Sequence, residues 1–291
     1  MNTLWSTCVQ GVGTLYQSRS LRFSDAFREE YRQAFGLEDS LSMLEIGCGP
    51  GALAEALHRW YPGATLRGID RDEHFIRFAR DKVPSASFDV GDATCLPYED
   101  GRFDVTLSHT VVEHVEPTGF FGEQHRVLKK GGVCLVLSVR RSIDVQAPMM
   151  RASSPLEDEI WRKVEARYGA FSREAGVGAY ALSEQELPLT MERHGFRDVS
   201  VRYLAVSLTP DDPGCPRETA YAIFEDQRQQ GLENADSLLA IAPEAVTPAE
   251  IEALKRERSA RADRRRALYD RGEKQWDTYT VLRGVFRGVK A

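Results

Sequence analysis

The sequence of 291 residues lacks several features that would each point to a class of protein. Its five cysteines are odd in number and scattered, and no pair has metal-ligand spacing, so we expect reduced thiols and no metal site. No apolar run approaches the roughly 20 residues that a membrane span needs. The start also lacks the basic and apolar segments of a signal peptide. These absences favour a cytoplasmic protein with no membrane partner.

An excess of positive charge is also absent, because 38 lysines and arginines face 44 aspartates and glutamates, which gives a net charge of −6. An acidic balance disfavours a nucleic-acid partner. The most basic stretch, residues 255–266, is diluted by Glu257 and Asp263 and lacks interleaved aromatic residues. We interpret it as a solvated helix face; the alternative is that one or two of its arginines meet an anionic substrate.

What the chain does contain is a glycine-rich bend between a strand-like run, residues 41–46, and a helical pattern. Gly47, Gly49 and Gly51 stand at every second position of this bend. Glycines let the backbone come close to a ligand because no Cβ intervenes. Asp70 ends a second strand-like run about 20 residues further on, where a carboxylate can accept hydrogen bonds from ribose hydroxyls. The pattern predicts a nucleoside site.

Two nucleoside cofactors fit this bend. Gly47, Gly49 and Ala52 match the dinucleotide pattern, so an NAD-dependent oxidoreductase is one alternative. Glu45 lies two residues before the first glycine, where its charge would repel a pyrophosphate but could hold a cationic ligand. Residues 91–93 and the lack of a Tyr-x-x-x-Lys pair also count against the dinucleotide.

Further strand-like runs cover residues 87–90, 103–108 and 132–138, and they alternate with helical segments. With these motifs the chain resembles the class I S-adenosylmethionine-dependent methyltransferases of the small-molecule type. The likeness rests on Glu45–Gly51, Gly68–Asp70, Gly91–Ala93, Phe103–Val105, Val112–Val115 and Arg126–Gly132. One departure is Lys130, where the family usually has proline, and it affects only a turn.

The resemblance implies an α/β fold: a Rossmann-like, seven-stranded, mostly parallel sheet with helices on both faces. Residues 1–40 would form an N-terminal helical cap, with helical spacing at 23–31, and residues 41–291 the methyltransferase domain. The last two strands, at 199–206 and 278–289, would pair antiparallel.

Long helical insertions interrupt this domain at about residues 140–182 and 209–276, since the strand pattern breaks after Ser138. The segment from Ser183 has a capping-box pattern, and Thr247 starts a helix in the same way. In the family such insertions build acceptor pockets, and the second could also serve a homodimer contact.

The resemblance further implies S-adenosyl-L-methionine as cofactor and S-adenosyl-L-homocysteine as product. Glu45 would hold the ammonium of the methionine part, Asp70 the ribose and Asp92 the adenine amine. The residues expected to contact the cofactor are Tyr16, Arg19, Glu45, Gly47, Cys48, Gly49, Gly51, Asp70, Arg71, Phe75, Gly91, Asp92, Ala93, Ser108 and His109. For Arg19 the alternative is a solvated charge at a helix end.

Methyl transfer is a displacement at carbon in which the cofactor supplies the electrophile, so the protein mainly binds, orients and excludes water. His109 or His114 could act as general base, because an imidazole titrates near neutrality, or both could only shape the site. Thr110, His114 and Trp276 are the candidate contacts of a small-molecule acceptor, such as a secondary metabolite. Trp276 could instead anchor the insertion. A cofactor-binding protein without turnover is a further alternative.

Overall fold

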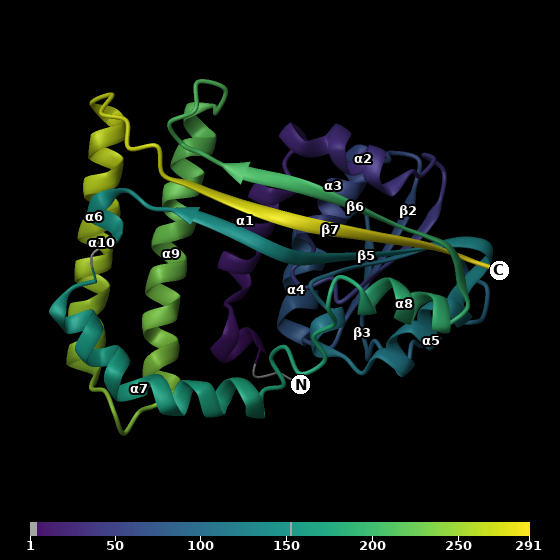
Figure 1. The fold of residues 1–291 in the computed structure, drawn as a ribbon, viewed down its shortest axis with the longest axis horizontal. Coiled ribbons are helices and arrows are strands. Elements are labelled where there is room, and N and C mark those ends of the chain that lie inside the picture. The colour runs from purple at the N-terminus through teal and green to yellow at the C-terminus, as the bar shows by residue number, and fades with distance from the viewer. Residues whose placement is uncertain (1–4, 152) are drawn as a thin grey trace.

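The computed structural model describes residues 5–151 and 153–291, which build a seven-stranded sheet in the order β3-β2-β1-β4-β5-β7-β6 (Figure 1). Neighbours from β3 to β5 are parallel, whereas β7 runs antiparallel to β5 and β6. The predicted fold class is confirmed. The strands are β1 (Ser42–Ile46), β2 (Thr65–Asp70), β3 (Ser87–Val90), β4 (Phe103–His109), β5 (Leu128–Val145), β6 (Phe196–Leu208) and β7 (Thr278–Lys290).

Helices cover both faces of the sheet and extend beyond one end of it (Figure 1). Three are short: η1 (Trp5–Val9), η2 (Asp25–Phe27) and η3 (Val112–His114). The α-helices are α1 (Val12–Arg22), α2 (Arg28–Phe35), α3 (Ala52–Trp60), α4 (Glu73–Lys82), α5 (Pro117–Val127), α6 (Pro148–Arg151), α7 (Pro155–Glu174), α8 (Glu186–Arg193), α9 (Arg217–Ile241) and α10 (Pro248–Asp270).

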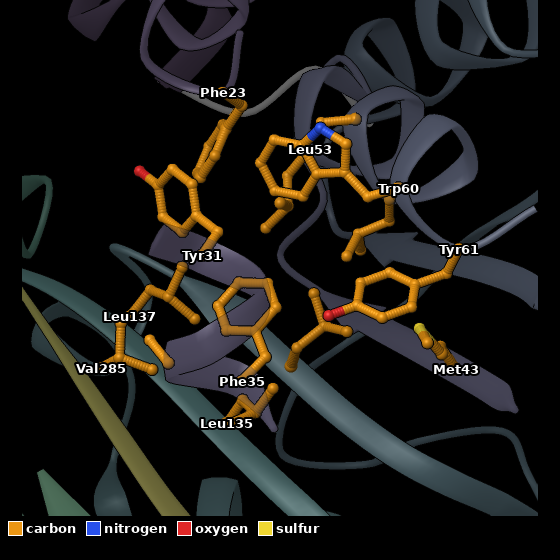
Figure 2. Packing of buried hydrophobic residues seen from close by; sticks show 14 of the residues in the cluster. Phe23, Tyr31, Phe35, Met43, Leu53, Trp60, Tyr61, Leu135, Leu137 and Val285 are labelled. Atoms are coloured by element: carbon orange, nitrogen blue, oxygen red, sulfur yellow. The ribbon is translucent and has the colours of Figure 1, made fainter. Parts of the chain in front are cut away.

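Successive side chains of a strand point to opposite faces of the sheet, and in the central strands β1 and β4 both faces are buried. Met43 of β1 packs in a cluster with Tyr31 of α2 and Trp60 of α3 (Figure 2). The next residue, Leu44, belongs to a second cluster with Phe121 of α5. One strand thus joins two cores, and its carboxyl end is held at a fixed depth between them.

The predicted capping boxes mark real helix starts. The Thr247 hydroxyl accepts a hydrogen bond from the Glu250 N–H at 3.3 Å, and the Glu250 carboxylate accepts one from the Thr247 N–H at 2.8 Å. Ser183 and Glu186 make the same reciprocal pair at 3.2 and 2.9 Å just before α8. Gly195, with φ of +88°, follows that helix and lets the chain turn into β6.

Two predicted boundaries are wrong. Strand β5 continues past Ser138 to Val145, because its charged end pairs with β7 as far as Thr278. The helical spacing at residues 23–31 is interrupted, since α1 ends at Arg22 and a 3₁₀ turn precedes α2. Asp25 fixes that turn by accepting a hydrogen bond from the Trp60 indole at 2.8 Å.

The two long insertions fold as helices that pack on each other beyond the sheet, with α9 and α10 side by side and α7 across them (Figure 1). Helix α1 packs against α9. The N–H of Gly11 donates to Glu233 at 3.1 Å, and the Gln17 amide donates to the carbonyl of Ala222 at 3.2 Å. Within the described residues, no helix is both long and apolar enough to cross a membrane.

Candidate functional site

A cavity of about 410 Å³ opens at the carboxyl ends of β1 and β4. The chain leaves β1 toward β2 on one side, while β4 lies on the other side, and ligands of open α/β sheets bind at such a divergence. Most of the predicted site residues meet here. They are Arg19, Glu45, Gly47, Cys48, Gly49, Asp70, Arg71, Phe75, Gly91, Asp92, Ala93, His109, Thr110 and His114.

Three residues predicted to contact the cofactor support the cavity without lining it. Tyr16 donates a hydrogen bond to Glu55 at 2.7 Å, and this partner fixes its hydroxyl on α3. Ser108 is fully buried in the sheet. Gly51 begins α3 with φ of +88°, and a Cβ there would come within 3.1 Å of Ala79. These three residues therefore support the residues that line the cavity.

Trp276 lies elsewhere, in the connection between α10 and β7. Its side chain is 51% exposed, and its backbone N–H donates to Asp211 at 2.8 Å. The prediction that Trp276 contacts an acceptor is therefore wrong for this cavity, because the buried carboxylate of Asp211 holds the chain at a different place. Its exposed ring does not anchor the insertion in a core either.

The glycine bend joins three strand ends at the cavity floor. The N–H groups of Gly47 and Cys48 both donate to the carbonyl of Ile69, at 2.8 and 3.1 Å, which ties β1 to β2. Gly47 has φ of +68°, and a Cβ on it would lie 2.3 Å from the side chain of Val111, which follows β4. A larger residue at this bend would push the β4 segment away.

Glu45 is a deeply buried acid of the site. Its side chain is 4% exposed, and its Oε2 has no hydrogen-bond partner among residues 5–151 and 153–291. Burial, and then the charge of Asp70, raise its pKa well above the usual value. A buried carboxylate without a partner is costly, and a cationic ligand in the cavity would compensate it.

Asp70 and Asp92 present carboxylates at the ends of β2 and β3. Asp70 accepts hydrogen bonds from the N–H groups of Gly49 and Asp72, both at 2.9 Å, which orient it, although burial raises its pKa. Asp92 accepts from the hydroxyl and N–H of Thr94 at 2.7 Å, and these bonds lower its pKa. Asp92 is thus a turn acid that also lines the cavity.

Arg19 brings a positive charge from α1 to the same cavity. Its guanidinium lies 3.4 Å from the hydroxyl of Thr110, and no carboxylate of the described chain comes within 4.0 Å of it. Burial, and then the neighbouring Arg22 and Arg283, lower its pKa to about 9. The group stays charged at neutral pH and is not the solvated helix-end charge of the alternative hypothesis.

His109, at the end of β4, stays uncharged. Burial, followed by the charges of Arg283 and Arg19, lowers its pKa well below the usual value. Its ring meets Phe23 edge to face at 5.0 Å, and its Nε2 finds no partner in the described part of the chain. A ring of such low pKa is a weak base, so the general-base hypothesis for His109 loses its premise of titration near neutrality.

His114 has a ring N–H that can donate a hydrogen bond. Its Nδ1 accepts a hydrogen bond from the Gly178 N–H at 2.9 Å, so we infer that the neutral ring carries its proton on Nε2. Burial lowers its pKa below the usual value. The geometry makes His114 a residue that orients an oxygen or holds a loop, while its catalytic role stays a prediction.

Thr110 is strained. It has φ of +53°, which is rare for a β-branched residue, and bonds from its N–H to Leu137 and from its hydroxyl to His109 hold it there. Such strain clusters at functional sites. Thr110 was predicted as an acceptor contact, but no sequence signal predicted its strained backbone.

A helical cap of residues 1–40 was predicted, but the particular residues that cover the cavity were not. Trp5, Leu15 and Phe23 reach it from the first helices, and Tyr180 from the connection after α7. These residues lie far apart in the sequence and share no motif, so only their packing identifies them. Among the described residues, no group of three or more His, Cys, Asp and Glu could hold a metal ion.

Comparison with known sequences agrees with this geometry. Residues 44–136 match the family model of a methyltransferase domain. Ajmaline N-methyltransferase of Rauvolfia serpentina is 31% identical over 131 residues, which cover 42% of this chain and 44% of that protein. The chain spans less than half the length of the curated relatives it matches first.

Solved structures resemble the whole chain. Phosphoethanolamine N-methyltransferase 2 of Haemonchus contortus, in complex with S-adenosyl-L-methionine, has a TM-score of 0.54 at 16% identity, covering 98% of this chain and 59% of that one. A putative methyltransferase of Bacillus halodurans has a TM-score of 0.50 at 17% identity, covering 91% and 99%. At these identities the likeness shows a shared Rossmann-like fold.

Proposed function

The chain carries a class I S-adenosylmethionine-dependent methyltransferase domain, and from this premise we propose that the whole protein methylates a small organic acceptor. An acceptor of the secondary-metabolite kind suits a cavity covered by the N-terminal helical segment and by Tyr180 of the first insertion. The observation that carries the proposal is the buried Glu45, which lines the cavity beside the glycine bend and has an oxygen without a hydrogen-bond partner among the described residues.

The charged groups of the cavity fit this cofactor. Glu45 would accept from the ammonium of its methionine part, and Arg19 would bind the carboxylate of the same part. Asp70, oriented by two backbone N–H groups, has lone pairs left for the ribose hydroxyls. Asp92 and Ala93 would border adenine. The cavity thus offers an opposite charge to the ammonium and to the carboxylate of the methionine part, which supports the assignment.

When bound, S-adenosylmethionine supplies an electrophilic methyl carbon on a sulfonium. The remaining tasks belong to the chain. Aromatic lining residues, among them the buried Phe23 and the exposed Tyr180, exclude water, and the strained Thr110 holds the segment after β4 in place. His109 lines the cavity and stays uncharged next to a cationic ligand, so orientation carries more of the reaction than proton removal.

The test is Glu45→Gln, titrated calorimetrically with S-adenosylhomocysteine, which keeps the ammonium. We expect the dissociation constant to rise about 100-fold, or roughly 2.7 kcal/mol, because a buried charge-assisted hydrogen bond is lost. The free variant should melt at a higher temperature, since an ionised Glu45 of raised pKa costs folding free energy at neutral pH. Unchanged binding would refute the assignment.

A matched control is Glu99→Gln, the same change at an exposed position, which should alter neither binding nor melting. Titration with NADH distinguishes the oxidoreductase alternative, because that protein would bind the dinucleotide and ignore S-adenosylhomocysteine. Accumulation of S-adenosylhomocysteine with a small-molecule extract, but not with RNA or protein, distinguishes turnover of a small acceptor from binding alone.

A further inference from the structure

A second cavity, of about 420 Å³, lies between α1 and the insertion helices. Its walls come from α1, α9 and α10 and from the ends of β5, β6 and β7 where these strands project toward the insertion (Figure 1). Arg19 of α1 lines the first cavity, and Arg22, three positions later, lines the second. The same helix therefore separates the two cavities.

Asp226 of α9 lines this second cavity and has an unsatisfied oxygen. Its side chain is 4% exposed, and its Oδ2 accepts a hydrogen bond from Gln230 at 2.7 Å. Its Oδ1 has no partner within the described ranges. Burial raises the pKa of Asp226, whereas Gln230, Arg22 and Arg19 oppose the rise. A hydrogen-bond donor is missing at this oxygen.

Arg22 is an opposite charge without an ion-pair partner in the described part of the chain. It is 8% exposed, and its Nη1 donates to the carbonyl of Ser18 at 2.6 Å. In the described chain it makes no ion pair within 4.0 Å, not even with Asp226 on the same cavity wall. Two buried, opposite charges that face one space without touching each other leave room for a ligand between them.

The other arginines of the cavity wall are already paired. Arg258 and Arg261 share Glu157 at 3.0 and 2.5 Å, and Arg228 binds Asp263 at 3.0 Å. Arg265, 1% exposed, binds Asp211 and Asp277, but its Nη1 finds no partner among the described residues. On this wall, Oδ1 of Asp226 and Nη1 of Arg265 thus lack hydrogen-bond partners within the described residues, and the Arg22 guanidinium lacks an ion pair.

We propose that the second cavity binds a small zwitterion of the amino-acid type. Its ammonium would meet Asp226, and its carboxylate would meet Arg22 and the free Nη1 of Arg265. The apolar side chains of Leu208, Ile223 and Phe224 on the same wall would receive an apolar body. The unsatisfied oxygen of Asp226 makes a simple anion a poor fit, because Asp226 would be left buried without a donor beside a like charge.

The test uses the full chain saturated with S-adenosylhomocysteine, so that the first cavity is filled. Three probes share one body: L-phenylalanine, 3-phenylpropanoate without the ammonium, and 2-phenylethylamine without the carboxylate. We expect calorimetry to show the amino acid binding at least tenfold more tightly than either analogue. L-alanine and L-leucine extend the series to smaller bodies.

Two variants give opposite signatures. Asp226→Asn should weaken L-phenylalanine at least tenfold and leave 3-phenylpropanoate unchanged. Arg22→Gln should weaken both carboxylates and leave 2-phenylethylamine unchanged. Asp236→Asn, the same change at an exposed position of α9, is the matched control. If Arg22→Gln does not fold, Asp226→Asn still decides, because it removes a buried charge whose pKa is raised.

Heat from none of the three amino acids, or equal affinity for the three probes, would overturn the proposal. Unchanged amino-acid binding in Asp226→Asn would do the same. In Glu45→Gln, without S-adenosylhomocysteine, L-phenylalanine should bind as in the unsubstituted protein. That result separates the second site from the cofactor cavity even if the proposed function fails.

Discussion

The two cavities on either side of α1 contain similar charged residues, but the acids belong to different kinds of secondary structure. In the first, Glu45 of β1 faces Arg19; in the second, Asp226 of α9 faces Arg22. The first acid belongs to a strand buried on both faces next to the glycine bend. The second belongs to an insertion helix that packs against α7 and α10 through an apolar cluster and forms ion pairs with α10. The glycine bend thus shapes one cavity, whereas helix packing and ion pairs shape the other, and this contrast can be tested by substitution.

The largest effect should come from Arg265→Met, which leaves Asp211 and Asp277 buried without their common partner. Breaking a buried ion pair from one side costs about 3–5 kcal/mol. Urea unfolding followed by circular dichroism measures it. Arg228→Met, which removes a pair with the exposed Asp263, should change stability by less than about 0.5 kcal/mol. Equal losses in the two variants would mean that charge pairing does not organise the second cavity.

Gly47→Ala tests the backbone of the first cavity. The new Cβ would sit 2.3 Å from Val111 in a left-handed conformation, so we expect a loss of about 2–4 kcal/mol. Gly101→Ala shares the positive φ, of +64°, but meets nothing within 4 Å, and should cost only about 1–2 kcal/mol. The difference in urea midpoints isolates the close approach. If both variants unfold alike, the bend is not tight.

Ser154→Ala tests the helix cap next to the ion pairs of the second cavity. Ser154 caps α7 by accepting from the Glu157 N–H at 3.2 Å, and the same Glu157 holds Arg258 and Arg261. Loss of the cap should cost about 1 kcal/mol. Ser172→Ala, inside α7, should be neutral, and thermal melting of both variants measures the difference.

The smallest effect concerns pH. Because the pKa of His109 is lowered, the unfolded chain takes up a proton first, and stability should fall as the pH drops below about 6.5. Glu45 acts oppositely, because its raised pKa lets the folded protein take up a proton earlier. Between pH 7.5 and 5.5, Glu45→Gln should therefore lose more stability than the unsubstituted protein, by about 1 kcal/mol or less. The reverse order in melting temperature would contradict the direction given for Glu45, and a variant whose stability does not fall would contradict that for His109.

The sequence predicted what the backbone demands. Glycines at the bend, alternating apolar runs and capping pairs each require particular residue types, so β1 to β4 and the starts of α8 and α10 could be placed in advance. The carboxylates of the first cavity follow from the same bend, since Glu45 and Asp70 lie at fixed distances from its glycines.

Charges on helices and strands were harder to predict. Arg265 stands in a basic stretch that is typical of a solvated face, yet it is buried because Asp211 and Asp277 come from distant segments. The charged end of β5 extends as a strand because β7 provides a partner, which its own residues do not indicate. Trp276 was misplaced for the same reason: its position depends on a contact with a residue more than sixty positions away.

The position of β7 has a consequence for how the protein folds. This strand comes later in the chain than both of its neighbours, yet it lies between them in the sheet. During synthesis β6 has no strand to pair with until β7 has left the ribosome. Until then, the edges of β5 and β6 that β7 will join stay unpaired. Such long-range pairing is slow, and uncovered edges invite association. A chaperone that shields this half of the nascent chain should raise the yield of native protein.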